Sequence, residues 1–279
     1  KPGEAPPPGY SLFQRNEYNS TLTWEEKAPI SIGRYAFDGV EVINEKIYFS
    51  GVDGESQNFE GAKLLERYDP SSSQWENLSP MSIKRYSMCA AVLDGKYYAI
   101  GGDFNRTMEI YDPTTDSWSY GPNTPIMFDH SSATTYAGRI YITGGTSSIE
   151  YKKFFVFDPL TNQWTSLADK SFSGRGGNLI NFRERLWAIG SEGVESYDVD
   201  TDSWQIEAPM VYPREHAVAW TDNERIYVAT GRINANSTIT RISTIELYDP
   251  ITAIWSIAGN FPEARDVADA AIVRGRVYV

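Results

Sequence analysis

Six tryptophans recur along this 279-residue chain at a nearly regular interval, and no other feature restricts the possible folds as strongly. They are separated by 40 to 51 residues, at Trp24, Trp75, Trp118, Trp164, Trp204 and Trp255. Seven residues before five of them stands an aromatic residue followed by aspartate, at 68–69, 111–112, 157–158, 197–198 and 248–249. A period of this size corresponds to one supersecondary unit per repeat.

Each repeat predicts four short strands, which we name a to d in chain order. Strand a alternates, as in 88–93, and strand b is an apolar run that usually ends in glycine, as in 96–102. The Asp-Gly pair at 94–95 predicts a tight a–b hairpin, and the Asp-Pro pair at 112–113 predicts the c–d turn. Strand d carries the tryptophan. Strand c carries a recurring glutamate, at Glu66, Glu109, Glu195 and Glu246. Such units bury both faces when several pack around an axis, as in a β-propeller.

These residues resemble a known family. The glycine pair after strand b, the Glu-x-Tyr-Asp-Pro sequence and the trailing tryptophan resemble the kelch repeat over about residues 11 to 279. The Trp-Asp dipeptide of the competing WD40 propeller does not occur in the sequence. Val52 and Ser191 replace the second glycine, and Phe157 replaces the tyrosine. These departures predict altered b–c loops rather than another fold.

The two ends of the chain complement each other. Residues 17–24 read as strands c and d, whereas 265–273 and 276–279 read as strands a and b. We therefore predict an all-β, six-bladed kelch propeller with four antiparallel strands per blade and the last blade shared between the termini. Residues 1–9 are interpreted as a linker or tail. The predicted blades are 25–78, 79–121, 122–167, 168–207, 208–258, and 259–279 with 10–24.

Composition excludes several kinds of function. The chain has 25 Lys and Arg against 37 Asp and Glu, a net charge of −12, whereas nucleic acid and anionic membrane surfaces require a basic face. No apolar run reaches the length of about 18 residues that a membrane helix needs. The single cysteine, Cys89, excludes an internal disulfide and a multi-cysteine zinc site. Two histidines leave little for a histidine-based centre, so no metal and no cofactor are expected.

The kelch resemblance implies that ligands bind at one mouth of the central channel, where the d–a and b–c loops lie. Alignment of the repeats places arginines near this entrance in five of the six blades. The predicted ligand-binding set is Arg34, Tyr35, Arg85, Tyr86, His130, Arg175, Arg214, His216 and Arg265. The alternative for each single arginine is a structural role, since such guanidinium groups often bond backbone carbonyls or a neighbouring blade. Glu215, Asp129 and Asp266 are candidates to neutralise them.

We interpret the chain as a non-catalytic scaffold that binds a protein, an acidic peptide or an anionic carbohydrate through the channel-mouth loops. Guanidinium suits a carboxylate because its planar fork donates two parallel hydrogen bonds. The alternative is a sugar-acid isomerase similar to N-acetylneuraminate epimerase, with Arg214 or Arg175 holding the carboxylate and Glu215 or His216 as the acid–base group. A third hypothesis is a structural propeller whose partner binds a blade edge or the opposite face.

Two features of the sequence bear on the cellular location. The first residue is Lys1, which favours a processed chain or a fragment. Four Asn-x-Ser/Thr sequences and the acidic composition favour a secreted or periplasmic protein.

Overall fold

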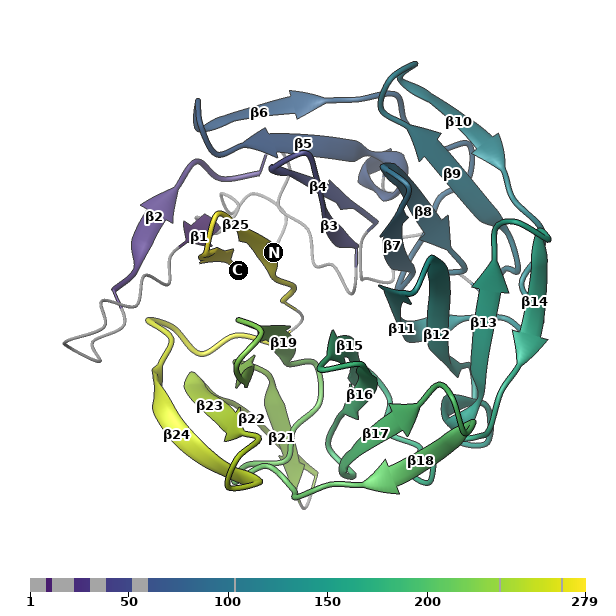
Figure 1. The fold of residues 1–279 in the computed structure, drawn as a ribbon. Coiled ribbons are helices and arrows are strands. Elements are labelled where there is room, and N and C mark those ends of the chain that lie inside the picture. Colours follow the sequence, from purple (N-terminus) through teal and green to yellow (C-terminus); the bar gives the residue numbers. More distant parts are fainter. Residues whose placement is uncertain are drawn as a thin grey trace.

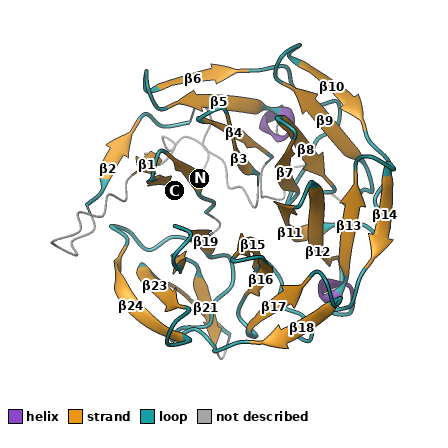
Figure 2. Cartoon of the chain, viewed as in Figure 1, coloured by secondary structure: helices purple, strands orange, loops and turns teal. Residues whose placement is uncertain are grey.

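The computed structural model describes residues 9–11, 23–30, 39–51, 60–102, 104–235, 237–266 and 268–279. In these ranges the strands form six four-stranded antiparallel sheets that surround a central axis (Figure 1). The predicted all-β propeller with four-stranded antiparallel blades is confirmed. Helical structure in the same ranges is limited to two short 3-10 turns, η1 (Glu60–Lys63) and η2 (Glu150–Lys152) (Figure 2). No helix of the described chain is long and apolar enough to span a membrane.

Five blades come from continuous stretches of the chain. Blade 1 contains β3 (Val40–Ile43), β4 (Lys46–Ser50), β5 (Leu65–Asp69) and β6 (Gln74–Asn77). Blade 2 contains β7 (Cys89–Leu93), β8 (Lys96–Ile100), β9 (Met108–Asp112) and β10 (Ser117–Tyr120). Blade 3 contains β11 (Asp129–Tyr136), β12 (Arg139–Gly145), β13 (Phe154–Asp158) and β14 (Gln163–Ser166).

Blade 4 contains β15 (Asn178–Phe182), β16 (Arg185–Ile189), β17 (Val194–Asp198) and β18 (Ser203–Ile206). Blade 5 contains β19 (Val218–Thr221), β20 (Ile226–Ala229), β23 (Thr244–Asp249) and β24 (Ile254–Asn260). Its b–c connection forms a separate hairpin of β21 (Arg232–Ala235) and β22 (Thr238–Arg241). The four strands of each blade are therefore strands a to d of one sequence repeat.

Blade 6 joins the two ends of the chain. It contains β25 (Ala271–Val273) and β26 (Arg276–Tyr278) from the C-terminus, with β1 (Gly9–Ser11) and β2 (Glu25–Lys27) from the N-terminus. Strand β1 lies between β26 and β2, pairing Ser11 with Tyr278 and Tyr10 with Glu26 (Figure 1). Main-chain hydrogen bonds thus close the ring and cover an edge that would otherwise stay open.

The N-terminal strands lie elsewhere than the sequence suggested. We expected both strands within 17–24, but β1 lies at 9–11 and β2 begins at Glu25, directly after Trp24. Residues 12–22 lie outside the described residues. The Trp24 ring packs edge-on against Phe261, with 4.4 Å between ring centroids. In this blade the tryptophan therefore anchors the segment before strand d, whereas Trp75 and its counterparts lie within their strands.

The repeated aromatic residues form the cores. In blades 1 to 5 the strand-c aromatic contacts the strand-d tryptophan, with ring centroids 5.0 to 5.4 Å apart. The Trp118 indole N–H also donates to the Ser79 carbonyl at 2.7 Å, and three other repeat tryptophans bond the corresponding link before their blade. Each such tryptophan therefore fixes the chain that enters its blade as well as filling the core.

Candidate binding face at the channel mouth

The d–a loops of blades 2 to 5 share one feature that aligns these blades. Each has a residue with positive φ just before or at the start of strand a: Ser87 (50°), His130 (50°), Gly176 (62°) and His216 (55°). The residue two places earlier we name the slot residue, and it is Arg85, Phe128, Gly174 or Arg214 in blades 2 to 5. The backbone supports this register, since Gly102 N–H donates to the Phe128 carbonyl and Gly231 N–H to the Arg265 carbonyl. Arg265 is thus the slot residue of blade 6.

The slot arginines of blades 2 and 5 lie inside their blades. The Arg85 guanidinium is fully buried, pairs with Glu109 at 2.9 Å, and donates to the carbonyls of Gly101 (2.6 Å) and Thr107 (3.1 Å). Burial lowers the pKa of this guanidinium, and the Glu109 carboxylate opposes that effect. The group has no route to a ligand at the mouth.

Arg214 repeats this arrangement in blade 5. It pairs with Glu246 and donates to the carbonyls of Thr230 (3.1 Å) and Thr244 (2.7 Å). Burial lowers its pKa as well, again against the effect of the glutamate. We therefore leave Arg85 and Arg214 out of the binding set that the sequence suggested.

The recurring strand-c glutamate has a structural function that sequence reasoning missed. Glu109 accepts the backbone N–H groups of Ser82 (2.8 Å) and Ile83 (3.4 Å), besides the Arg85 guanidinium. Glu246 accepts the N–H groups of Val211 and Tyr212 in the same way. The carboxylate therefore holds both the d–a loop and the slot arginine.

In blade 3 both the slot arginine and the strand-c glutamate are replaced. Phe128 occupies the slot and Phe155 replaces the glutamate, with their rings edge-on and 5.9 Å apart. Pro125, which has no N–H, stands at the position from which Ser82 donates to Glu109 in blade 2. An apolar pair thus replaces an ion pair, as buried pairs often allow. The joint replacement of arginine and glutamate in blade 3 was the sequence signal for the glutamate's role.

Three residues of the predicted set do meet at the mouth. The Arg175 side chain is exposed, and its Nη2 lies 2.8 Å from His130 Nε2. Asp129 Oδ2 lies 2.8 Å from His130 Nδ1, which fits a ring that donates from Nδ1 and accepts at Nε2. The rings of His130 and His216 stack with centroids 6.0 Å apart. Burial, followed by the charges of Arg232 and His130, lowers the pKa of His216 to about 3.

A second charged group links blade 5 to blade 6. Arg232 in β21 lies 2.8 Å from Glu215 and 3.6 Å from Asp266, and Arg241 in β22 lies 2.5 Å from Asp266. The carboxylates Glu215 and Asp266 therefore neutralise the hairpin arginines rather than the predicted arginine column. Asp129 contacts His130 instead.

The remaining predicted residues lie apart from this group. Arg34 and Tyr35 fall outside the described residues. Tyr86 is buried beside Ala62. Arg265 is half-buried, pairs with Glu263 at 3.2 Å, and lies over the Phe261 ring.

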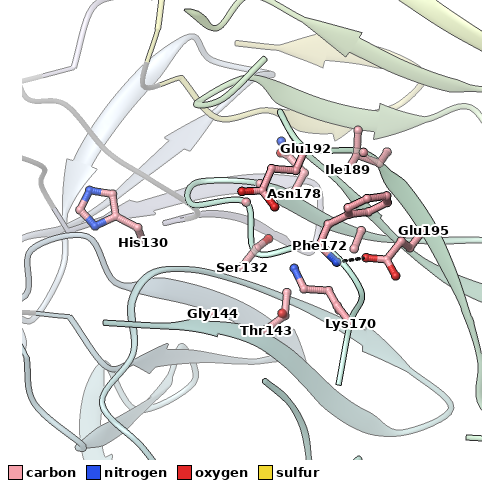
Figure 3. A pocket seen from close by; sticks show the side chains of 15 residues that line it. His130, Ser132, Thr143, Gly144, Lys170, Phe172, Asn178, Ile189, Glu192 and Glu195 are labelled. Atoms are coloured by element: carbon pink, nitrogen blue, oxygen red, sulfur yellow. Dashed lines mark hydrogen bonds between the residues drawn. The ribbon is translucent and has the colours of Figure 1, made fainter. Parts of the chain in front are cut away.

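A cleft opens at this face between blades 3 and 4 (Figure 3). His130, Ser132 and Thr143 line it from blade 3, and Glu192 and Glu195 line it from blade 4. The empty space of the cleft is about 400 Å³ if the solvent at its mouth is counted. The volume in which the centre of a water molecule fits is much smaller, about 20 Å³. The cleft therefore has room for the end of one side chain.

Lys170 also lines this cleft, with Phe172 beside it. Burial lowers the pKa of Lys170 to about 8, although the Glu195 and Glu192 charges oppose the shift. Sequence reasoning missed Lys170, and the available signal was its place in the repeat. Lys170 occupies the position of Met81 and Met210, which are both buried. Among the described residues, no cluster of three His, Cys, Asp or Glu side chains is arranged to hold a metal ion.

The family is established by comparison with known proteins. A family model described as the Kelch motif matches residues 84–125 and 127–171. The chain belongs to the kelch-repeat family. Kelch-like protein 23 of Homo sapiens is 28% identical over 254 residues, which are 88% of this chain and 45% of the relative. Kelch-like protein 36 of Bos taurus is 25% identical over 263 residues, covering 86% of this chain and 42% of the relative.

The kelch chain spans less than half the length of these curated relatives. Among solved structures, one titled "Structure of YjhT" matches with a TM-score of 0.73 and 16% identity, covering 85% of this chain and 87% of the other. At that identity the likeness concerns the fold alone. The mouth of this kelch propeller thus combines exposed guanidinium groups, a stacked histidine pair and a narrow cleft that contains buried charge.

Proposed function

We propose that this kelch propeller is a non-catalytic protein-binding module and that its partner contacts the d–a and b–c loop face of blades 3 to 5. The observation that carries the proposal is a loop-built charged surface on this face. Arg175 is exposed on the d–a loop of blade 4, and the Arg241 side chain is 60% exposed on β22. The same hairpin presents Ile239, which is 55% exposed. Guanidinium groups and exposed apolar side chains are typical of protein interfaces.

The size of the cleft favours a protein partner over a small molecule. Sites for small ligands usually enclose about 300–1,000 Å³ and bury most of the ligand. Here only about 20 Å³ is open to the centre of a water molecule. A protein would cover the face and insert one side chain, whereas a free sugar would remain mostly in solvent.

The exposed arginines favour an acidic segment in that partner. A carboxylate can accept two parallel hydrogen bonds from a guanidinium group. The net charge of −12 disfavours acidic partners over most of the protein, so an acidic segment would bind where it can contact exposed Arg175 and replace Asp266 as the partner of Arg241. Association should therefore weaken as the salt concentration rises.

The test uses peptides selected from a random displayed library against the unmodified propeller. Affinities are then measured for Arg175→Glu/Arg241→Glu and for a matched control, Arg139→Glu/Arg274→Glu. The control arginines are also exposed, but Arg139 follows an a–b turn and Arg274 lies in one, at the other end of the blades. We expect at least about a tenfold loss for the face variant, or about 1.4 kcal/mol, and little change for the control. Equal binding to parent and face variant would place the binding surface elsewhere.

One observation favours a second candidate, the isomerisation of a sugar acid. The pKa of Lys170 is lowered to about 8 in a cleft that it shares with His130, and shifted pKa values gather at catalytic sites. Of the residues first considered, Arg214 and His216 are buried and Glu215 is paired with Arg232, whereas Arg175 is exposed at the mouth. The discriminating experiment follows the anomers of N-acetylneuraminate by proton NMR with the parent and with Lys170→Met. We expect no acceleration, and acceleration lost in Lys170→Met would establish the enzyme instead.

A further inference from the structure

Blade 4 retains the strand-c glutamate but lacks the slot arginine. Glu195 is 1% exposed and accepts the N–H groups of Ser171 (2.8 Å) and Phe172 (2.9 Å), as Glu109 and Glu246 do in their blades. The slot residue here is Gly174. Glu109 and Glu246 each have a guanidinium partner, whereas no ion pair within the described ranges includes Glu195. A buried carboxylate is thus held in place without the guanidinium partner that Glu109 and Glu246 have.

The carbonyl acceptors of the missing arginine are also present. In blade 2, Arg85 donates to the carbonyls of Gly101 and Thr107, and Gly101 N–H donates to the same Thr107 carbonyl at 3.0 Å. In blade 4, the corresponding bond runs from Gly190 N–H to the Gly193 carbonyl, also at 3.0 Å. Both glycines line the cleft. The backbone that receives a guanidinium in blade 2 is therefore formed in blade 4 as well.

The space that the arginine would fill is open. A Cβ added to Gly174 would meet no atom nearer than 3.9 Å, the backbone nitrogens of Ser191 and Glu192 among them. The φ of Gly174 is not in the left-handed region, so a side chain there would not meet left-handed backbone strain. The Phe172 ring lies against Gly193 and forms one wall, and Figure 3 shows Glu192 and Glu195 on the same cleft.

The charge of the cleft favours a cation. Two carboxylates, Glu192 and Glu195, face a single ammonium group, that of Lys170. Glu192 accepts bonds from the Ser173 N–H and hydroxyl. Lys170 approaches from the position of Met81 rather than from the slot, and it forms no ion pair with either carboxylate in the part of the chain that the structure describes. Among the side chains that line the cleft, carboxylates therefore outnumber ammonium groups by one.

We propose that this cleft, which we name the blade 4 socket, binds the guanidinium group of an arginine side chain supplied by the protein partner. The guanidinium group would donate to Glu195 and to the carbonyls of Gly190 and Gly193, as Arg85 donates to Glu109, Gly101 and Thr107. Arginine fits better than lysine because five N–H donors in a plane can reach a carboxylate and separate carbonyls together. A partner's side chain fits better than a free ligand because only its end can be enclosed.

This inference rests on the proposed function in one respect, since the arginine comes from a partner that covers the same face. The probe is therefore a capped tripeptide, acetyl-Gly-Arg-Gly-amide, which tests the socket without that partner. Its control is the same peptide with citrulline, which has nearly the shape of arginine but no charge. We expect the arginine peptide to shift the amide NMR signals of residues 171–177 and 190–195, and the citrulline peptide to leave them in place.

The decisive variant is Gly174→Arg, which supplies the guanidinium group from the chain itself. It should abolish peptide binding and raise the melting temperature, whereas Ser166→Arg, which adds the same charge on an exposed position of β14, should do neither. If Gly174→Arg does not fold, Glu195→Gln replaces it and should weaken binding about tenfold or more. Any of three results would overturn the proposal: equal shifts from both peptides, binding retained in these variants, or free L-arginine binding about tenfold tighter than the peptide. Failure here leaves the proposed face untouched, because its test depends on Arg175 and Arg241.

Discussion

Replacing Arg214 by methionine should destabilise the propeller strongly. The change removes a fully buried guanidinium group and leaves the Glu246 carboxylate, also fully buried, without its cation. The carbonyls of Thr230 and Thr244 lose their donor as well. Breaking a buried pair in this way costs about 3–5 kcal/mol of the free energy of unfolding. At about 2–4 °C per kcal/mol for a chain of this size, the melting temperature should fall by about 6–20 °C.

Thermal unfolding followed by circular dichroism measures this effect. The matched control is Arg265→Met, which removes the slot arginine of blade 6. The partner of Arg265, Glu263, is 56% exposed, so the loss there should be at most about 1 kcal/mol. A melting temperature for Arg214→Met within about 2 °C of the parent would refute the structural role. Arg214 would then return to the ligand-binding set that the sequence suggested.

Three further predictions concern pH, closure and metals. His216 is buried and titrates at about 3, so the unfolded chain, with a histidine pKa of about 6.5, binds a proton that the folded chain does not. The free energy of unfolding should therefore fall by about 2 kcal/mol as the pH is lowered from about 7 to about 5. This pH-dependent loss should be absent in His216→Asn. Asparagine is chosen because it tolerates the φ of 55° at this position. Equal pH dependence of the urea midpoint in both proteins would contradict this. Deleting residues 10–24 removes most of β1 together with Trp24, which is half-buried against Phe261, so the product should unfold or aggregate. A deletion variant with the melting temperature of the parent would disprove closure by the N-terminus. Elemental analysis after dialysis should find no stoichiometric transition metal, and one atom per chain would revive the enzyme hypothesis.

The fold could be predicted because its determinants recur at fixed spacing. The aromatic pair of strands c and d, such as Tyr111 and Trp118, lies seven residues apart and forms the same contact in blades 1 to 5. Closure could be predicted because the two ends supplied complementary strands. The location of the N-terminal strands could not, because Trp24 precedes β2 rather than lying inside it.

The candidate site was harder to predict because burial depends on residues distant in the chain. Arg85 is paired with Glu109, 24 residues later, and Arg214 with Glu246, 32 residues later. Each glutamate was visible in the sequence, but its contact with the arginine was not. Placing Gly174 rather than Arg175 in the slot required the positive φ of Gly176, and this one-residue difference separates an exposed arginine from an empty socket.

The most direct test of the proposed binding face is hydrogen exchange of the propeller with and without a selected peptide. We predict slower exchange in residues 170–177, 190–193 and 232–241, which form the d–a and b–c loops of blade 4 and the β21–β22 hairpin. Slower exchange confined to the outer strands β6, β10, β14 and β18, or to the a–b turns, would contradict the proposed face.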